Sequence, residues 1–207
     1  DGERLHGRWS LVHTHPKDGG KQADKQWLLI KSKEPAPSEV APRAPAAQLA
    51  TAASGPPRDD GWISEVKHDG YRLLATKTGP RVSLVTRGGL DWTSRFPRVA
   101  RAIAALPAST AVLDGEAVVL DAQGRSDFGA LQQAIGRDDA RIVYVAFDCL
   151  HLDGADLAST PLVTRKDALH GLLERAPRAA SAHVLYGDHV VGQTEAFHRE
   201  ACALGLE

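Results

Sequence analysis

The sequence predicts an α+β fold in which a domain with a mixed or antiparallel sheet follows a short β-hairpin. Two strand-like runs near the start are followed by a Pro- and Ala-rich stretch at 35–60, which is typical of an interdomain linker. After residue 61, strand-like and helix-like runs are mixed without the strict alternation of βαβ units. The 207 residues suffice for one domain with a real core, or for one domain plus a fragment.

Residues 1–34 predict the hairpin. Its strands are expected at 7–13 and 25–31, with a polar loop between them. A lone hairpin is marginally stable, so we interpret it as the end of a domain whose main body lies upstream. The expected organisation is therefore a domain remnant at 1–34, a linker at 35–60 and a second domain at 61–207.

The second domain is expected to contain five strands and four helices. Pro97 falls in the first turn of one helix, where its missing N–H has no cost, and Gly136 and Gly205 follow two others as stop signals. Ser126 is expected to cap the helix that begins at 127. The strands are expected at 62–68, 81–87, 111–120, 142–150 and 183–186, and the helices at 94–106, 127–135, 164–174 and 193–204.

Composition and charge limit the possible functions. The chain is 43% hydrophobic and 25% charged, without an apolar run of membrane-spanning length, so we expect no membrane partner. The net charge of −1 argues against tight non-specific nucleic-acid binding, although a local patch can still contact DNA. Cys149 and Cys202 fit buried free thiols in a reducing cytoplasm. Because the first residue is Asp1 and not Met, we expect an excerpt of a longer protein.

The most informative stretch is residues 67–72, Lys-His-Asp-Gly-Tyr-Arg, of the form Lys-x-Asp-Gly-x-Arg. It places a primary amine at a strand end, before a glycine turn and an arginine. An enzyme needs this arrangement if a lysine is to attack the α-phosphate of a nucleotide and hold the nucleotide covalently. In a strand, Glu65, Lys67 and Asp69 would share one face. An exposed, ion-paired lysine at a strand end is the alternative.

A nucleophilic lysine in this setting predicts a metal ion. A free lysine has a pKa of about 10.4, so almost all of it is protonated at neutral pH. Carboxylates on the same wall would raise that pKa, which opposes nucleophilic attack. A divalent cation and an arginine would reverse the effect, so we expect Mg²⁺ or Mn²⁺ to be obligatory.

Three further patterns are candidate nucleotide contacts. Arg87 lies in a Gly-rich turn, where it would reach a ribose or phosphate, although a plain hairpin turn explains the same pattern. Asp114 and Glu116 share one face of an apolar strand, which suits ribose hydroxyls or a metal, or else a bulge with a salt bridge. Phe147 lies near a strand end, where it would stack on a purine or belong to the core.

In order and spacing, these patterns resemble the nucleotidyltransferase motifs I, Ia, III and IIIa of the ATP-dependent DNA ligases. The matching residues are 67–72, Arg87-x-Gly89, Asp114-Gly115-Glu116 and Phe147-Asp148. Over about residues 61–207 the chain is also similar to the ligase domain of the bacterial end-joining DNA ligase D family. The additional similar stretches are Asp91-Trp92-Thr93-x-Arg95-Phe96-Pro97, Phe128-x-x-Leu131-Gln132, Leu152-Asp153-Gly154-x-Asp156-Leu157 and Pro161-Leu162-x-x-Arg165-Lys166.

The first 34 residues resemble the last strands of the 3′-phosphoesterase domain of the same family. The resemblance is carried by Leu5-x-Gly7-x-Trp9-x-Leu11-Val12 and by the run at 26–31. The catalytic residues of such a domain would lie upstream of this chain, so we assign no phosphoesterase activity to it. His13 and His15 would share a strand face, either as a metal pair or as a solvated strand end.

The ligase resemblance implies a role for each candidate residue. Lys67 would form the lysyl-AMP phosphoramidate with ATP, and Glu116 and Glu207 would bind the Mg²⁺ or Mn²⁺ ion. Glu65 would read the adenine amino group, and Phe147 would stack on adenine. The other nucleotide contacts, to the ribose, the phosphates or the 5′-phosphate of a nick, would come from Asp69, Arg72, Arg87 and Glu116.

The sequence departs from the family at two places. Residues 86–89 read Thr-Arg-Gly-Gly where the family usually has Ser-Arg-Asn-Gly, and the lost Asn would loosen that turn. Residues 205–207 resemble the start of motif IV, which would leave motif V and the OB-fold domain beyond Glu207. We therefore expect an incomplete adenylation domain that adenylates itself poorly or not at all.

The implied parent activity is the ATP-dependent sealing of nicked or broken double-stranded DNA in bacterial non-homologous end joining. The implied partners are a Ku-type end-binding protein and a polymerase or primase module. The implied location is the cytoplasm, at the nucleoid when the protein is on DNA. Two alternatives remain open: an RNA ligase or capping-type nucleotidyltransferase, although Glu65 favours ATP, and a non-catalytic remnant.

Overall fold

The computed structural model describes residues 9–13, 27–31, 45–59, 61–137 and 139–206. The chain divides into two compact units, 1–38 and 39–207. In the first unit, strands β1 (Trp9–His13) and β2 (Trp27–Lys31) pair antiparallel, as expected for a hairpin. His15 lies outside the described residues, and the assignment of this unit to a phosphoesterase domain stays a prediction.

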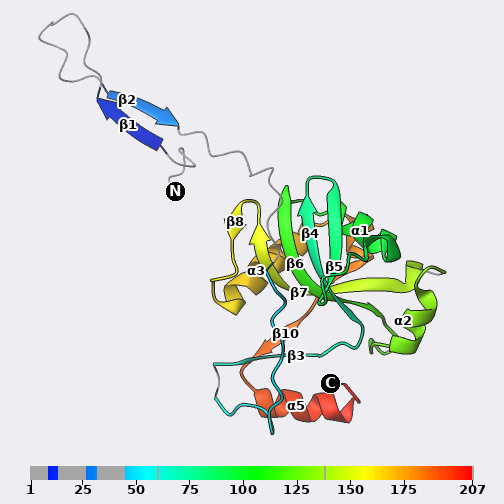
Figure 1. The fold of residues 1–207 in the computed structure, drawn as a ribbon. Coiled ribbons are helices and arrows are strands. Elements are labelled where there is room, and N and C mark those ends of the chain that lie inside the picture. Colours follow the sequence, from blue (N-terminus) through cyan, green and yellow to red (C-terminus); the bar gives the residue numbers. More distant parts are fainter. Residues whose placement is uncertain (1–8, 14–26, 32–44, 60, 138, 207) are drawn as a thin grey trace, which may run out of the picture. The chain divides into compact units, whose positions relative to one another are not determined.

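The second unit is built on a six-stranded sheet (Figure 1). Its strands are β4 (Tyr71–Thr78), β5 (Arg81–Thr86), β6 (Thr110–Val119), β7 (Ile142–Leu152), β8 (Ala155–Asp156) and β9 (Val184–Tyr186). The order is β5-β4-β6-β7-β8 with antiparallel neighbours, and β9 pairs parallel with β7. The predicted mixed, mainly antiparallel sheet is therefore confirmed.

A second, two-stranded sheet is formed by β3 (Ile63–Glu65) and β10 (His189–Val191). Helix α5 (Thr194–Ala203) packs against both strands, and Figure 1 shows this group below the six-stranded sheet. The predicted strand at 62–68 is wrong beyond Glu65, because the chain leaves the sheet there and runs irregularly until Tyr71.

The remaining helices pack on the six-stranded sheet. They are α1 (Pro97–Ala104), α2 (Phe128–Ala134), α3 (Leu162–Glu174) and α4 (Arg178–Ser181), with 3₁₀ turns at Thr93–Arg95 and Asp139–Arg141. Helix α1 contacts β4 and β5, and α3 contacts β7 and β9. The predicted cap of α2 is wrong, because the side chain of Asp127, and not that of Ser126, accepts from the Ala130 N–H. None of the helices among the described residues is long and apolar enough to cross a membrane.

Strands β4, β6 and β7 form the centre of the core. Every residue of β6 is buried except Glu116, which is only partly buried. Tyr144 of β7 has no exposed surface, and its hydroxyl donates to the carbonyl oxygens of Leu73 at 2.9 Å and Leu113 at 3.2 Å. This buried centre positions the site residues that β4, β6 and β7 carry.

Candidate functional site

A cleft of about 1080 Å³ opens beside the irregular segment between β3 and β4. Other parts of its lining come from the turn after β5, from single residues of β6 and β7, and from the segment 186–188. The seven predicted site residues within the described part of the chain all line it: Glu65, Lys67, Asp69, Arg72, Arg87, Glu116 and Phe147. Glu207, the second predicted metal ligand, lies outside the described residues.

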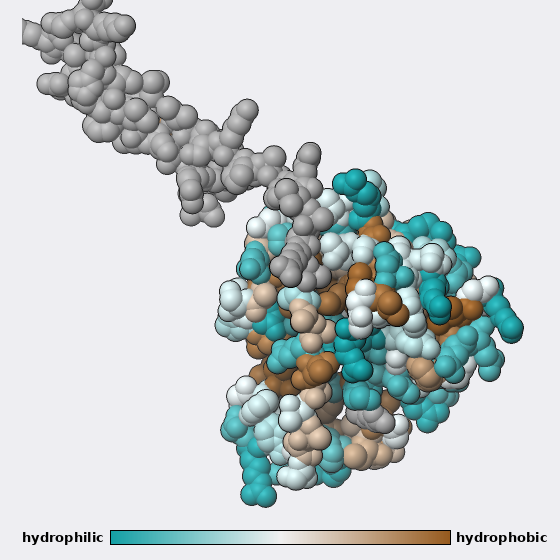
Figure 2. Space-filling model, in the orientation of Figure 1, coloured by the Kyte–Doolittle hydropathy of each residue, from teal (hydrophilic) through white to brown (hydrophobic). Residues whose placement is uncertain are grey.

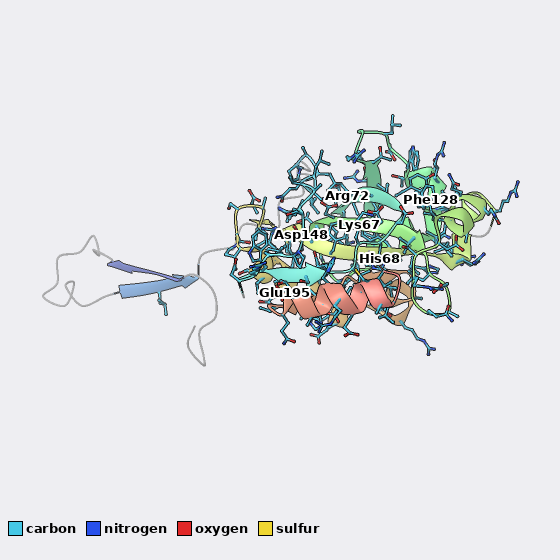
Figure 3. All side chains as sticks on the ribbon, turned by 90° about the horizontal axis from the view of Figure 1, so that it is seen from below. Lys67, His68, Arg72, Phe128, Asp148 and Glu195 are labelled. Atoms are coloured by element: carbon cyan, nitrogen blue, oxygen red, sulfur yellow. The ribbon has the colours of Figure 1, made fainter. Side chains whose placement is uncertain are left out.

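The cleft belongs to a surface of mixed character. On the face shown in Figure 2, hydrophilic and apolar surface alternate. Figure 3 shows Lys67, His68 and Arg72 together in the middle of the domain, with β3 and α5 side by side below them. The candidate chemistry is therefore concentrated where the two sheets of the second unit meet.

Backbone contacts hold the segment 66–70 against β6. A Cβ at Gly70 would overlap the carbonyl oxygen of Ala117, so only glycine permits this approach. The Asp69 N–H donates to Ser126 Oγ at 2.8 Å, which ties the segment to the turn before α2. The predicted shared strand face is thus wrong. An irregular segment, fixed by long-range contacts, brings Lys67 and Asp69 to the cleft instead.

Arg72 forms a two-pronged ion pair with Asp114 of β6. The distances are 3.0 Å from Nε to Oδ1 and 2.7 Å from Nη2 to Oδ2, and this hydrogen bonding raises the pKa of Arg72. Nη1 donates to the Gln48 carbonyl oxygen at 2.6 Å, and the guanidinium carbon lies 5.4 Å from the ring centre of Phe147. Arg72 therefore braces one wall while its charge borders the cleft.

Phe147 reaches the cleft through a break in strand register. The β6–β7 ladder pairs Asp114 with Asp148 but the next residue of β6 with Ala146, so Phe147 is the extra residue of a β-bulge. The neighbouring Asp148 carboxylate instead accepts from Arg165 of α3 at 2.8 and 2.9 Å. The pair Phe147-Asp148 thus supplies an aromatic ring for the cleft and an anchor for α3.

Glu116 is the acidic residue of β6 that borders the cleft. Burial raises its pKa to about 7, although Arg72 opposes the shift. Among the described residues, no group of three or more His, Cys, Asp or Glu could hold a metal alone. Mg²⁺ is commonly bound by one or two carboxylates together with substrate phosphates, and Glu116 fits that kind of site.

Glu65, at the end of β3, is paired with a lysine that the sequence analysis named in a family-like stretch but did not predict as a site residue. Lys166 of α3 is fully buried, and its ammonium pairs with Glu65 Oε1 and donates to the Gly187 carbonyl oxygen at 2.9 Å. The unusual position of Lys166 is visible in the sequence pattern. Lys166 shares the buried face of α3 with Leu169 and Leu172, where a charged residue is unusual.

Arg87 lies at the tip of a tight turn. The Gly89 N–H donates to the Thr86 carbonyl oxygen at 2.8 Å, and Gly89 has a φ of 84°, which favours glycine. Thr86 Oγ1 also accepts from the Leu90 N–H at 3.1 Å. The hairpin turn is therefore closed without the expected Asn, and it carries the exposed side chain of Arg87 to the cleft.

Several other residues complete the lining. Leu49 and Ala50, from the stretch predicted as linker, border the cleft, as do Trp92 and Tyr186. Trp92 packs edge-on against Tyr71 with ring centres 4.9 Å apart. The sequence offered little signal for the first two, because short apolar residues in a Pro- and Ala-rich stretch are typical of linkers.

His68 lies between the exposed side chains of Lys67 and Asp69 and is more buried than either. It is partly buried, its Nδ1 has no hydrogen-bond partner among the described residues, and burial lowers its pKa. A neutral imidazole beside Lys67 adds no positive charge that would compete with the amine. The site thus combines an amine, two guanidinium groups, a carboxylate acceptor and an aromatic ring.

Comparison with known proteins gives a consistent result. The family described as "ATP dependent DNA ligase domain" matches residues 47–207. The "Multifunctional non-homologous end joining protein LigD" of Pseudomonas aeruginosa is 36% identical over 84% of this chain and 26% of its own length. The corresponding "DNA repair protein LigD" of Mycobacterium tuberculosis is 34% identical over 83% of this chain and 22% of its own length. The chain therefore spans about a quarter of the length of these curated relatives.

Solved structures agree with this match. The ligase domain of M. tuberculosis LigD has a TM-score of 0.58 and 32% identity, and the likeness covers 70% of this chain and 46% of that one. A mycobacterial DNA ligase D complexed with ATP and MES gives the same TM-score of 0.58 and 32% identity, over 70% of this chain and 45% of that one.

Proposed function

This chain belongs to the family of ATP-dependent DNA ligase domains, and from that premise we propose that its cleft binds ATP and that Lys67 accepts AMP from it. The proposal rests on one observation, which is that the predicted site residues come together around one space. Side chains from four separate segments, each expected from its own motif, line one space of about 1080 Å³. That volume is in the range of small-molecule sites, and the residues around it match the chemical groups of a nucleotide.

In this proposal the nucleotide lies with its base between Glu65 and Phe147 and its phosphates toward Arg72 and Arg87. Lys67 Nζ attacks the α-phosphorus, the N–P bond forms as the P–O bond to pyrophosphate breaks, and the amine proton passes to solvent. The two guanidinium groups stabilise negative charge on the phosphates. A divalent cation held by Glu116 and the phosphates would neutralise further charge.

The lysyl-AMP state is the first of three steps that we propose for the whole protein. AMP would next pass to the 5′-phosphate of a DNA break, and a 3′-hydroxyl would then displace AMP and join the strands. The relatives named for non-homologous end joining support this role, as does the DNA ligase D structure that contains ATP. A Ku-type partner, a polymerase module and a cytoplasmic location belong to the same proposal.

We also propose that residues 1–34 derive from a phosphoesterase domain and that the adenylation domain follows the linker. The separation into units at residues 38 and 39 supports two parts. The family match from residue 47 and the contact of Gln48 with Arg72 support an adenylation domain that starts within the stretch first assigned to the linker.

The test is the intact mass of the chain after incubation with ATP and Mg²⁺ or Mn²⁺. We expect a gain of one AMP at low yield, located on Lys67 by peptide mapping and absent in Lys67→Ala. A gain that persists in Lys67→Ala would contradict the proposal. Parallel incubation with GTP identifies a capping-type enzyme, which would be labelled by GTP in preference to ATP.

A further inference from the structure

Lys166 is a buried cation that lies outside the cleft and yet contacts three residues that line it. Its ammonium pairs with Glu65 Oε1 and donates to the Gly187 carbonyl oxygen at 2.9 Å. It also lies 5.2 Å from the ring centre of Tyr186. A single side chain of α3 therefore joins β3, from the small sheet, to the segment after β9, from the large sheet.

The ion pair determines which oxygen of Glu65 can serve a ligand. Oε1 is buried against the ammonium, whereas the Glu65 side chain as a whole is 32% exposed and lines the cleft. The polar atom that Glu65 can offer to the cleft is therefore Oε2. A carboxylate oxygen accepts hydrogen bonds and does not donate them.

Packing alone does not explain a lysine at this position. Residue 166 lies on the buried face of α3 with Leu169 and Leu172, where an apolar side chain would fit without the desolvation of a charge. Buried ion pairs often contribute no more stability than apolar residues of the same volume. The orientation that Lys166 imposes on Glu65 is the effect that an apolar residue could not supply.

We propose that Lys166 is a positioning residue: it holds Oε1 of Glu65, aims Oε2 into the cleft as a fixed acceptor, and so makes the site select a 6-aminopurine nucleotide over a 6-oxopurine nucleotide. This inference rests on the proposed function, which places a purine nucleotide in the cleft. A fixed acceptor binds the N–H of an amino group and repels the oxygen of a carbonyl group. Without the ammonium, the carboxylate is free to turn and the selection weakens.

The test compares the affinity of the chain for ATP with that for ITP, whose base carries a 6-oxo group. Titration calorimetry without divalent metal measures binding alone, because it does not depend on transfer of AMP. The intact chain should bind ATP about tenfold more tightly than ITP, since a hydrogen bond to a charged group is at stake. Lys166→Met should bring the ratio close to one, and a ratio that survives in this variant overturns the proposal.

Lys77→Met provides the matched control. Lys77 is also a buried lysine, but its ammonium donates to the carbonyl oxygens of Gly79 at 2.6 Å and Ala104 at 2.7 Å, and it does not line the cleft. This variant should lose stability and keep the ATP-to-ITP ratio of the intact chain. If it changes the ratio as much as Lys166→Met does, the effect is a general consequence of destabilisation and the proposal is wrong.

Glu65→Gln gives a second test that does not depend on the folding of the lysine variant. The buried ammonium requires an acceptor, so the amide oxygen of the glutamine should turn toward Lys166 and the NH₂ group toward the cleft. This variant should therefore prefer ITP, whereas Glu65→Gln combined with Lys166→Met should show no preference. Equal binding of ATP and ITP by Glu65→Gln alone contradicts the proposal.

The outcomes separate this inference from the proposed function. If the intact chain binds neither nucleotide, the proposed function is wrong and the inference falls with it. If the intact chain prefers ATP and Lys166→Met, shown to be folded by circular dichroism, keeps that preference, then the cleft binds a nucleotide and only the role of Lys166 is wrong.

Discussion

Two ion pairs border the cleft, and they differ in which partner faces it. In one pair the cation faces the cleft, and in the other the carboxylate does. On the wall formed by β4 and β6, the Asp114 side chain is 5% exposed and its partner Arg72 is 25% exposed and borders the cleft. On the wall that contains β3, Glu65 is 32% exposed, and its partner Lys166 of α3 lies outside the cleft with no exposed surface. Of the two pairs, one thus presents a hydrogen-bond donor with positive charge to the cleft, and the other presents an acceptor.

This contrast between the two ion pairs shows how one cleft can orient a ligand whose two ends differ in charge. Arg72 and Glu65 are each held by a buried counter-ion, so neither has to pair with the other across the cleft. In the proposed function, the donor wall serves the phosphates and the acceptor wall serves the base. The following predictions test whether the two walls behave as this contrast requires.

The largest effect on stability is expected from removal of the Glu65 carboxylate. Glu65→Ala leaves the Lys166 ammonium buried without its carboxylate, so we expect a loss of about 3 kcal/mol in the free energy of unfolding. Lys166→Met leaves Glu65 at a partly exposed position, where water can solvate it, and should cost about 1 kcal/mol. Urea denaturation measures both. If the lysine variant is the less stable of the two, our account of this wall is wrong.

A smaller loss of stability is expected from a change at Gly70, in the segment that joins β3 to β4. Gly70→Ala would force a methyl group onto the Ala117 carbonyl oxygen, and the segment 66–70 would have to move away from β6. We expect a loss of about 2 kcal/mol, as for other overpacked sites, together with weaker ATP binding. Gly55→Ala is the control, because a Cβ there meets no atom within 4 Å. Equal stability of the two variants would show that the segment can shift freely.

Replacement of the Glu116 carboxyl, on the wall formed by β4 and β6, is expected to increase the stability of the protein. Burial raises the pKa of Glu116 to about 7, so between pH 4.5 and about 7 the folded state keeps a proton that the unfolded state has already released. This contribution to stability is complete at low pH and is lost as the pH rises toward 7. Glu116→Gln should therefore be more stable than the parent by about 1.5 kcal/mol at pH 8, and the gain should fade by pH 5. Denaturation at the two pH values measures it, and a gain independent of pH would contradict the assignment.

The smallest effect on stability is expected at the edge of the donor wall. Arg87 is exposed on a closed turn, so Arg87→Gln should leave the unfolding free energy unchanged and lower ATP affinity about fivefold, or roughly 1 kcal/mol. Added salt should reduce the difference, because the contact is exposed. Arg81→Gln, at an exposed position of β5 outside the cleft lining, should bind ATP normally. A loss of affinity in both variants would indicate a diffuse charge effect.

The sequence predicted which side chains would meet, but it did not predict the path that brings them together. Glu65, Lys67 and Asp69 are expected on one strand face, yet the strand ends at Glu65. The path beyond it depends on Gly70 against β6, a contact with a residue far along the chain. A short motif specifies side-chain chemistry, whereas the backbone route is set by packing that no local pattern contains.

Strands β4 and β10 are among the elements that the sequence did not predict. Strand β4 was not predicted because its three consecutive residues Leu73, Leu74 and Ala75 are all buried, which removes the alternation that marks a half-exposed strand. Strand β10 has only three residues and little pattern to detect. Lys166, by contrast, could have been found, because a lysine in register with the leucines of a helix is visible in the sequence.

The bulge in β7 has an evolutionary consequence. A version of the strand without the extra residue would form a more regular ladder with β6, so selection for folding alone gives no reason to keep it. What the insertion supplies is the ring of Phe147 in the cleft. In a descendant that no longer needs the cleft, loss of one residue here would therefore remove the ring and leave a more regular sheet.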